Sequence, residues 1–167
     1  MVLAHLVPPG HNRSPVKKAS LTRRQFANQT QYDPIGAPLQ RVQIIKGYLE
    51  GGQHQEKIYD VACSDGLTVD PKTARCPDNG ASVNMDDCAT TDSAGASELK
   101  ALWRDPDFDS SQEAFYYVRV LENPTCRWST WDAIRAGEQP RSDLHKTLQE
   151  RAWSSPIWYR PDTTEAL

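Results

Sequence analysis

The sequence predicts a mainly β protein, a small antiparallel sheet or sandwich-like domain with one short helix and long loops stapled by disulfides. Short segments rich in β-branched and aromatic residues are separated by clusters of Gly, Pro, Asn and Asp, which is typical of antiparallel strands joined by turns. Four cysteines lie in or beside these loops. No strand-like segment alternates with a long helical one, so a parallel α/β sheet is not expected.

Composition and charge narrow the function classes. The 167 residues suffice for one domain with its own core, and 12 prolines and 9 glycines indicate many turns. The formal net charge of −3 provides no overall attraction for nucleic acid or an anionic membrane. No apolar run approaches the roughly 20 residues that cross a bilayer as a helix. Neither a nucleic-acid partner nor a membrane span is therefore expected.

Residues 1–38 differ from the rest of the chain because they are polar, basic and rich in proline, without hydrophobic periodicity. Arg23 and Arg24 mimic a twin-arginine export signal, but a polar stretch, Ala27–Asp33, follows where such a signal needs an apolar one. No functional signal peptide is visible, and we expect an irregular, flexible leader over residues 1–38.

A β-hairpin follows the leader. Leu39–Leu49 is dominated by β-branched and aliphatic residues and predicts a strand. Glu50–Gln53 contains a Gly-Gly pair, which adopts positive φ at little cost and is a hairpin turn signal. His54–Ala62 is then the returning strand.

Three further extended segments are expected. Ser97–Trp103 reads as a strand, and Ala114–Leu121 is the strongest strand of the chain, with apolar residues on both faces. Its position is therefore predicted to be central. Leu148–Tyr159 is the last extended segment, in which Pro156 favours an edge or a strand start. Residues 161–167 form a polar tail, which leaves 39–160 as the β-rich domain.

One short helix is predicted over Ser129–Ala136. Ser129 or Thr130 can serve as its N-cap, Asp132 would lie favourably in the first turn, and Gly137 is placed to end it.

The cysteines are expected to form disulfides, which implies an oxidising compartment. No pair has C-x-x-C spacing, and turn-forming residues surround Cys63, Cys76, Cys88 and Cys126. We predict the pairs Cys63–Cys76 and Cys88–Cys126, although four cysteines permit three connectivities and the sequence alone does not choose among them. Free buried thiols and a metal site are the alternatives.

The sequence motifs give little support for a catalytic site. The histidines are scattered without metal-ligand spacing, so His54 and His145 are expected to be solvated side chains and no metal ligand is assigned. Asp105, Asp107 and Asp109 lack the glycine and the terminal glutamate of a calcium loop, and we interpret them as turn aspartates. No catalytic residue is assigned.

Arg127 and Trp128 are the candidate substrate-facing residues. They follow the predicted central strand, and strand ends often carry binding groups. An arginine there can hold a phosphate or a carboxylate with its planar guanidinium. The alternative is that Arg127 stacks on Trp131 or Trp153 at the surface.

A family resemblance rests on five landmarks: Leu39–Gly47, Lys57–Ala62, Asp105–Asp109, Ala114–Glu122 and the tryptophan-rich end. From Leu39 to Tyr159, but not over residues 1–38, the chain resembles the C-terminal part of the domain of unknown function 3604 family. These are longer bacterial exported proteins related to metal-dependent hydrolases of the polymerase and histidinol phosphatase type. The resemblance implies that metal-binding histidines belong to an N-terminal catalytic domain.

Three function hypotheses follow. In the first, the chain is a non-catalytic accessory domain of an exported hydrolase-like protein, periplasmic or extracellular. Its partner is the upstream catalytic domain, which would hold any divalent metal, and Arg127 or Trp128 would reach the substrate cleft. In the second, the chain is a small secreted module that binds a carbohydrate or a protein through an aromatic-rich face. The third is a self-contained hydrolase, which bound zinc, manganese or iron would support.

Overall fold

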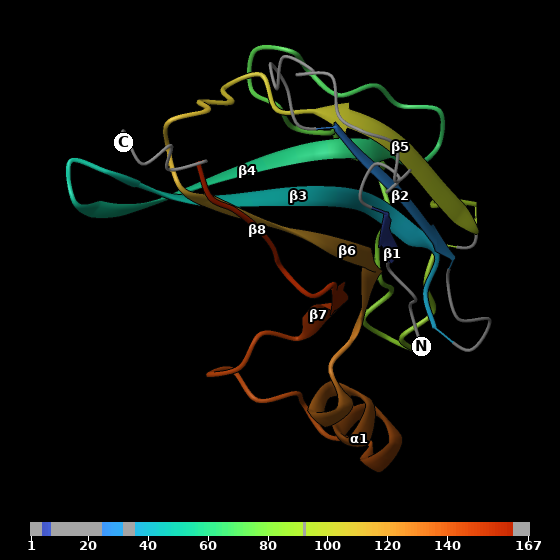
Figure 1. Ribbon diagram of the computed structural model, residues 1–167. Coiled ribbons are helices and arrows are strands. Elements are labelled where there is room, and N and C mark those ends of the chain that lie inside the picture. Colours follow the sequence, from blue (N-terminus) through green and yellow to red (C-terminus); the bar gives the residue numbers. More distant parts are fainter. Residues whose placement is uncertain (1–4, 8–24, 32–35, 92, 162–167) are drawn as a thin grey trace, which may run out of the picture.

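The computed structural model describes residues 5–7, 25–31, 36–91 and 93–161. Eight strands and one helix follow one another along these residues (Figure 1). They are β1 (His5–Val7), β2 (Gln25–Gln31), β3 (Leu39–Glu50), β4 (Gln53–Cys63), β5 (Glu98–Arg104), β6 (Ala114–Cys126), α1 (Trp128–Ala136), β7 (Thr147–Trp153) and β8 (Ile157–Tyr159). The prediction of a mainly β fold with one short helix is confirmed.

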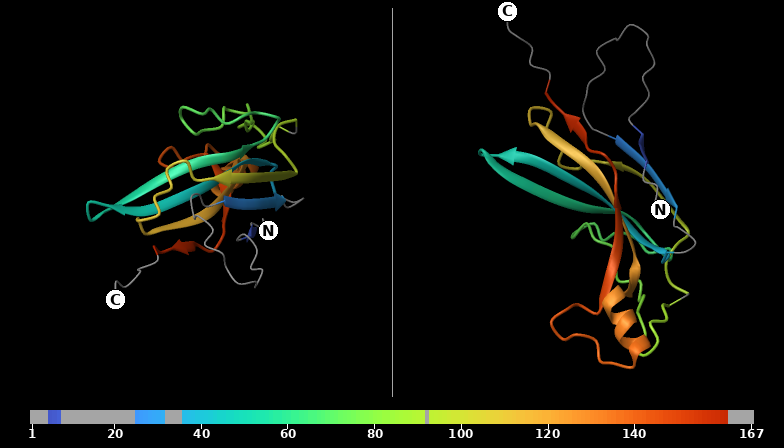
Figure 2. Two further views of the ribbon diagram at one scale, coloured as in Figure 1. Left: turned by 45° about the horizontal axis from the view of Figure 1, so that its top comes forward. Right: turned by 90° about the horizontal axis from the view of Figure 1, so that it is seen from below.

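The strands form two antiparallel sheets. The larger has five strands in the order β4-β3-β6-β7, with β8 also paired to β6, and the smaller has the order β1-β2-β5. The smaller sheet lies across one face of the larger one (Figure 1), and α1 and the β3–β4 turn lie at opposite ends of the molecule (Figure 2). The sandwich-like prediction is therefore confirmed.

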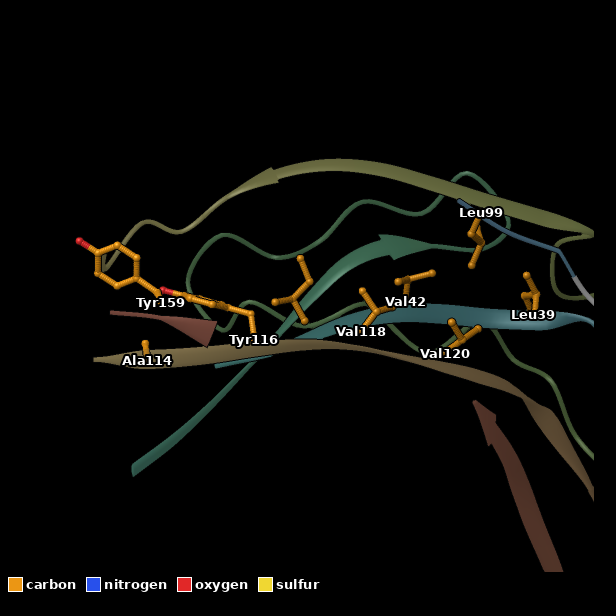
Figure 3. Packing of buried hydrophobic residues seen from close by; sticks show 9 residues of the cluster. Leu39, Val42, Leu99, Ala114, Tyr116, Val118, Val120 and Tyr159 are labelled. Atoms are coloured by element: carbon orange, nitrogen blue, oxygen red, sulfur yellow. The ribbon is translucent and has the colours of Figure 1, made fainter. Parts of the chain in front are cut away.

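The hydrophobic core lies between the two layers. The predicted hairpin is confirmed as β3 and β4, and the strand predicted to be central is β6, which pairs with β3, β7 and β8. Side chains of β3 and β6 point from the larger sheet toward Leu99 of β5 (Figure 3). The fully or almost fully buried apolar members of this core are Leu39, Val42, Ile44, Tyr116, Val118 and Val120.

Both predicted disulfides are present. Cys63–Cys76 closes the loop after β4, and Cys88–Cys126 ties the next loop to the end of β6. Gly95 ends this excursion with φ of 100°, where a Cβ would lie 2.6 Å from Asn123 Nδ2 and from Pro38 Cβ. The long segment between β4 and β5 is thus held by covalent bonds and close backbone packing rather than by strands.

The first 38 residues contain two strands that the sequence analysis did not predict. The expectation of an irregular stretch was wrong for β1 and β2, because β2 pairs with β5 along all seven of its residues. A partner more than 60 residues away leaves no local pattern in a polar strand such as Gln25–Gln31. Most of the predicted leader lies outside the described residues, so its flexibility remains a prediction.

The C-terminal elements differ from the prediction in two details. Arg127, rather than Ser129 or Thr130, is the N-cap of α1, and it makes no side-chain capping bond. The Thr130 hydroxyl instead donates to the Lys146 carbonyl at 2.8 Å, which ties α1 to the segment before β7. Because the helix begins one residue earlier, no acidic residue lies in its first turn, whereas Gly137 ends it in the left-handed conformation as expected.

The predicted last strand is split into β7 and β8. Its break spans residues 154–156, where the Ser154 hydroxyl accepts a hydrogen bond from the Val118 amide at 3.0 Å. Pro156, which has no amide hydrogen, comes directly before β8, in line with the predicted strand start.

Candidate functional site

The larger sheet has two chemically different faces because successive side chains of a strand point to opposite sides. The core face carries Val42, Ile44 and Lys46 of β3 and is covered by the smaller sheet. We call the opposite face, which carries Arg41, Gln43, Ile45 and Gly47 of β3, the groove face. Each face bears a cluster of polar residues that a functional site could use.

The core-face cluster, here the lysine cluster, consists of Lys46, Asp105, Tyr116, Asp107 and Tyr59. Lys46 Nζ is 2.7 Å from Asp105 Oδ2 and donates at 2.7 Å to the Asp107 carbonyl. Asp105 also accepts hydrogen bonds from the Tyr116 hydroxyl and the Asp107 amide. Tyr59 donates its hydroxyl to Asp107 Oδ2 at 2.7 Å.

The centre of the lysine cluster is closed to solvent. Lys46, Asp105 and Tyr116 are each at most 2% exposed. The ammonium also faces the Tyr48 and Tyr116 rings, 5.4 and 5.9 Å from their centroids. A buried charge is tolerated when its partners are complete, and here both charges are fully engaged with protein groups. The arrangement fixes the Asp105–Asp109 turn on the sheet and leaves no open position for a ligand at Asp105.

The edge of this cluster has shifted pKa values. Hydrogen bonds from Tyr59 and then Lys57 hold the pKa of Asp107 below its usual range. Burial, followed by the hydrogen bond to Asp107, raises the pKa of Tyr59, and the same carboxylate raises the pKa of Lys57. At neutral pH the tyrosine is therefore a neutral donor to an ionised carboxylate.

The aspartates of this turn confirm the interpretation as turn residues. The Asp107 amide donates to Asp105 Oδ1, and the Ser111 amide donates to Asp109 Oδ1. Sequence reasoning missed the ion pair between Asp105 and Lys46. The available signal was a lysine at a strand position whose neighbours two residues away are apolar and inward-facing.

The groove-face cluster, here the arginine groove, is a hollow of about 590 Å³ at the end of the sheet where β3 begins. It lies between β3, the end of β6, β7 and the loop closed by Cys63–Cys76. Its wall is formed by Gln40, Arg41, Cys76, Asp78, Pro124, Thr147, Leu148, Gln149 and Arg151. Arg41 and Arg151 both pair with Leu121 and so lie on the same face, two strands apart.

A buried carboxylate, Asp60, lies beside the groove and is already satisfied. It accepts hydrogen bonds from Gln43 Nε2 and from the Cys76 amide, each at 2.7 Å. Arg75 NH1 lies 3.5 Å from its Oδ1, and Arg41 Nε lies 4.0 Å from its Oδ2. Asp60 is therefore positioned by closer donors than Arg41, whose Nε is buried without a hydrogen-bond partner among the described residues.

Amide side chains form one rigid side of the groove. Gln149 Nε2 donates to Gln40 Oε1 at 2.9 Å and to the Glu122 carbonyl, and Gln40 Nε2 donates to Asn79 Oδ1. Asn79 is in turn bonded to Ser64 and to Asn123. This network links the disulfide loop, β3 and β7, so the groove is shaped before any ligand binds.

Aromatic residues occupy the opposite end of the groove face. The Phe115 ring covers Gly47, where a Cβ would come within 2.2 Å of the ring. Phe115 also lies near Tyr117, with nearly parallel rings, and near Trp158, with centroids 6.4 and 5.2 Å apart. A pocket of about 420 Å³ opens here, and Trp158 in its wall is 65% exposed. The groove face thus joins a charged end to an aromatic end.

Neither predicted substrate-facing residue is in the wall of the arginine groove, although Arg127 lies next to it. Arg127 follows Cys126, whose strand partner Thr147 lines the groove, and its amide donates to the Lys146 carbonyl. Its Nε is buried without a partner among the described residues. Trp128 is 72% exposed on α1. The ring contact expected of Arg127 is made instead by Arg135, whose guanidinium carbon is 5.0 Å from the Trp131 centroid.

The histidines and cysteines of the described residues are the remaining candidates for metal ligands. His54 lines the aromatic pocket and His145 is exposed in the segment before β7. Across residues 5–7, 25–31, 36–91 and 93–161, no group of three or more His, Cys, Asp or Glu side chains is placed to hold a metal ion. All four cysteines are engaged in disulfides.

Comparison with known proteins places the chain in a family. The description "Protein of unknown function (DUF3604)" matches residues 4–161. The match begins far before Leu39, so the expectation that the resemblance excludes residues 1–38 was wrong. No curated protein and no solved structure is significantly similar to the chain. Within the described part, no helix has the length and apolar character needed to cross a membrane. The chain belongs to the DUF3604 family of proteins of unknown function.

Proposed function

We propose that this chain is a binding domain that acts as a non-catalytic accessory part of an exported, hydrolase-like protein. The observation that carries the proposal is the groove face, on which incompletely paired arginines and exposed aromatic rings lie on one rigid sheet. Exposed tryptophan and arginine side chains are enriched at surfaces that bind a partner. The upstream catalytic part is the partner, and it would hold any divalent metal.

The two disulfides support a location in an oxidising compartment, either the periplasm or the outside of the cell. Under this proposal the accessory domain contributes binding groups to a cleft whose catalytic residues come from the partner. Arg127 and Trp128 remain candidates for such groups, together with the arginines of the groove.

A direct test of the non-catalytic role is hydrolysis by the pure chain. The chain is supplied with zinc, manganese or iron and assayed with phosphate and carboxylate esters of p-nitrophenol. We expect no turnover above that of the metal alone. Metal-dependent turnover that is lost in His54→Ala or His145→Ala would establish the self-contained hydrolase instead.

The partner surface is tested with two exposed tryptophans. Trp158→Ala removes a ring from the groove face, and Trp128→Ala removes an equally exposed ring from α1. With the catalytic part of a longer family member, we expect the first change to weaken association at least tenfold and the second to weaken it less, because Trp128 lies outside the groove face. The opposite order would place the interface on α1.

A second candidate function is a small secreted binding module. The observation that favours it is the aromatic end, because the rings of Phe115 and Trp158 can stack on the apolar face of a sugar. Binding of a neutral oligosaccharide that Trp158→Ala abolishes, without any association with a catalytic part, would select this candidate.

A further inference from the structure

We propose that the arginine groove is a binding site for an acidic sugar, with Arg41 and Arg151 holding its carboxylate. The inference rests on the proposed binding role of the chain and specifies the ligand class of one end of the groove face. It depends on three observations: guanidinium nitrogens without a hydrogen-bond acceptor, local charge, and the chemistry of the groove wall.

Two arginine Nε atoms in or next to the groove have no hydrogen-bond acceptor among the described residues. Three buried side-chain polar atoms of the described residues lack a hydrogen-bond partner, and two of them are Nε of Arg41 and Nε of Arg127. Leaving such a donor unsatisfied is costly, so native proteins keep few of them. Arg41 lines the groove and Arg127 lies one residue beyond the strand pair Cys126–Thr147 at its edge. The Arg41 side chain is 26% exposed in the groove wall, so its guanidinium group can bind an anion there although Nε itself is buried.

The local charge favours an anion. Arg151 is exposed in the groove wall and makes no recorded ion pair or hydrogen bond within the described residues. Two carboxylates lie nearby, but Asp60 is engaged with Gln43 and Cys76, and Asp78 accepts the Gly80 amide in its own turn. Hydrogen bonds leave both carboxylates charged, but Arg41, Arg75 and Arg151 provide three positive charges against these two, so the five groups sum to one net positive charge.

The groove wall suits a polyhydroxylated molecule better than a bare ion. A volume of about 590 Å³ falls in the range of small-molecule sites and is much larger than a single oxyanion needs. The amides of Gln40 and Gln149 and the hydroxyl of Thr147 are groups that hydrogen-bond to sugar hydroxyls, and Leu148 and Pro124 provide small apolar contacts. The hydrogen bonds among Gln40, Gln149 and Asn79 hold the amides in place before binding.

Calorimetric titration of the full chain with glucuronate, glucose and sulfate tests the assignment. We expect saturable binding of glucuronate with a dissociation constant on the order of 1 mM, as a ligand of that size allows. Sulfate should bind at least tenfold more weakly because it lacks the hydroxyl contacts, and glucose should show no binding because it lacks the charge.

Variants locate the site. Arg151→Gln and Arg41→Gln should each weaken glucuronate binding roughly tenfold or more, as the loss of a charge-assisted hydrogen bond predicts. Arg141→Gln is the matched control, because Arg141 is exposed and pairs with Asp143, away from the groove wall. Should Arg41→Gln not fold, Arg41→Lys keeps the charge but not the planar geometry, and it should also weaken binding.

Three outcomes overturn the inference: no binding of glucuronate, an equal loss in Arg141→Gln and Arg151→Gln, or sulfate binding as tight as glucuronate binding. The failure is distinguishable from that of the binding role itself. If glucuronate does not bind while Trp158→Ala still weakens partner association, the groove assignment fails and the proposed function stands.

Discussion

The lysine cluster and the arginine groove lie on opposite faces of the same sheet and use their charges in opposite ways. In the lysine cluster, Lys46 and Asp105 are buried, and each is bonded to the other and to further polar groups of the protein. In the arginine groove, Arg41 keeps a buried donor that has no acceptor in the described part of the chain, and Arg151 lines the hollow. Completed buried charges hold a structure together, whereas incompletely paired charges beside a hollow are available for a ligand.

The largest effect should come from breaking the lysine cluster. Asp105→Ala leaves the Lys46 ammonium buried without its carboxylate, which should lower the free energy of unfolding by about 3–5 kcal/mol. Urea unfolding followed by tryptophan fluorescence measures this change. Asp109→Ala on the same turn is the control, since the Asp109 carboxylate is hydrogen-bonded to Ser111 among the described residues, and should cost about 1 kcal/mol or less.

A change in the arginine groove should hardly alter the free energy of unfolding in the same experiment. Arg151→Gln removes an exposed charge and should change the free energy of unfolding by at most about 0.5 kcal/mol. A large loss of stability in Arg151→Gln, or a small one in Asp105→Ala, would remove the distinction between the two clusters.

Removing a disulfide should have the next largest effect on the free energy of unfolding. Chain-entropy reasoning assigns roughly 4 kcal/mol to Cys88–Cys126, with a sequence separation of 38, and roughly 3 kcal/mol to Cys63–Cys76, with a separation of 13. Double alanine variants of each pair, compared by urea unfolding, measure both. Cys76 lines the groove and its amide donates a hydrogen bond to Asp60. Of the two double variants, only the one that lacks Cys63–Cys76 should therefore also lower the affinity for glucuronate, because Asp60 loses this contact. Retention of full affinity in that variant would show that the loop does not shape the site.

The aromatic end provides a smaller packing effect. Gly47→Ala forces the Phe115 ring away and should cost about 1–3 kcal/mol, as overpacking does. In the background of Phe115→Ala the same change should cost much less, because the ring is gone. A double-mutant cycle measures the coupling, and additive losses would mean that Phe115 does not rest on Gly47.

The smallest effect is a pH dependence at the edge of the lysine cluster. The folded-state pKa of Asp107 is lowered by hydrogen bonds from Tyr59 and Lys57, so its contribution to stability is present above the unfolded pKa near 3.8. That contribution is lost as the pH falls through the folded pKa. Asp107→Asn should therefore show a shallower loss of stability below about pH 4 than the unchanged chain. Identical acid unfolding curves would contradict the cause assigned to the shift.

Much of the fold could be predicted from the sequence because its signals are local. The hairpin around Gly51–Gly52, the apolar strand Ala114–Leu121 and the helix stop at Gly137 each depend on neighbouring residues. Strand β2 could not be predicted in this way, because its stability comes from pairing with β5. The disulfide pairs were anticipated, although the sequence alone permits other connectivities.

The candidate site depended far more on tertiary structure. Arg41, Asp60 and Arg151 come from three strands, and no spacing in the sequence shows that they meet beside one hollow. Arg127 was singled out from its place after β6, and it does lie beside the groove. Lys46 and Asp105 are 59 residues apart, and only the lysine at an inward-facing position indicated that a buried partner exists.

The most direct test of the central claim is an NMR titration that maps backbone shifts while a galacturonate trisaccharide is added to the full chain. The account predicts saturable shifts in the groove wall, at Arg41, Thr147, Leu148, Gln149 and Arg151. It predicts unchanged signals for Lys46, Asp105 and Tyr116 of the closed cluster. Shifts that centre on the lysine cluster, or no shifts on the groove face at all, would contradict it.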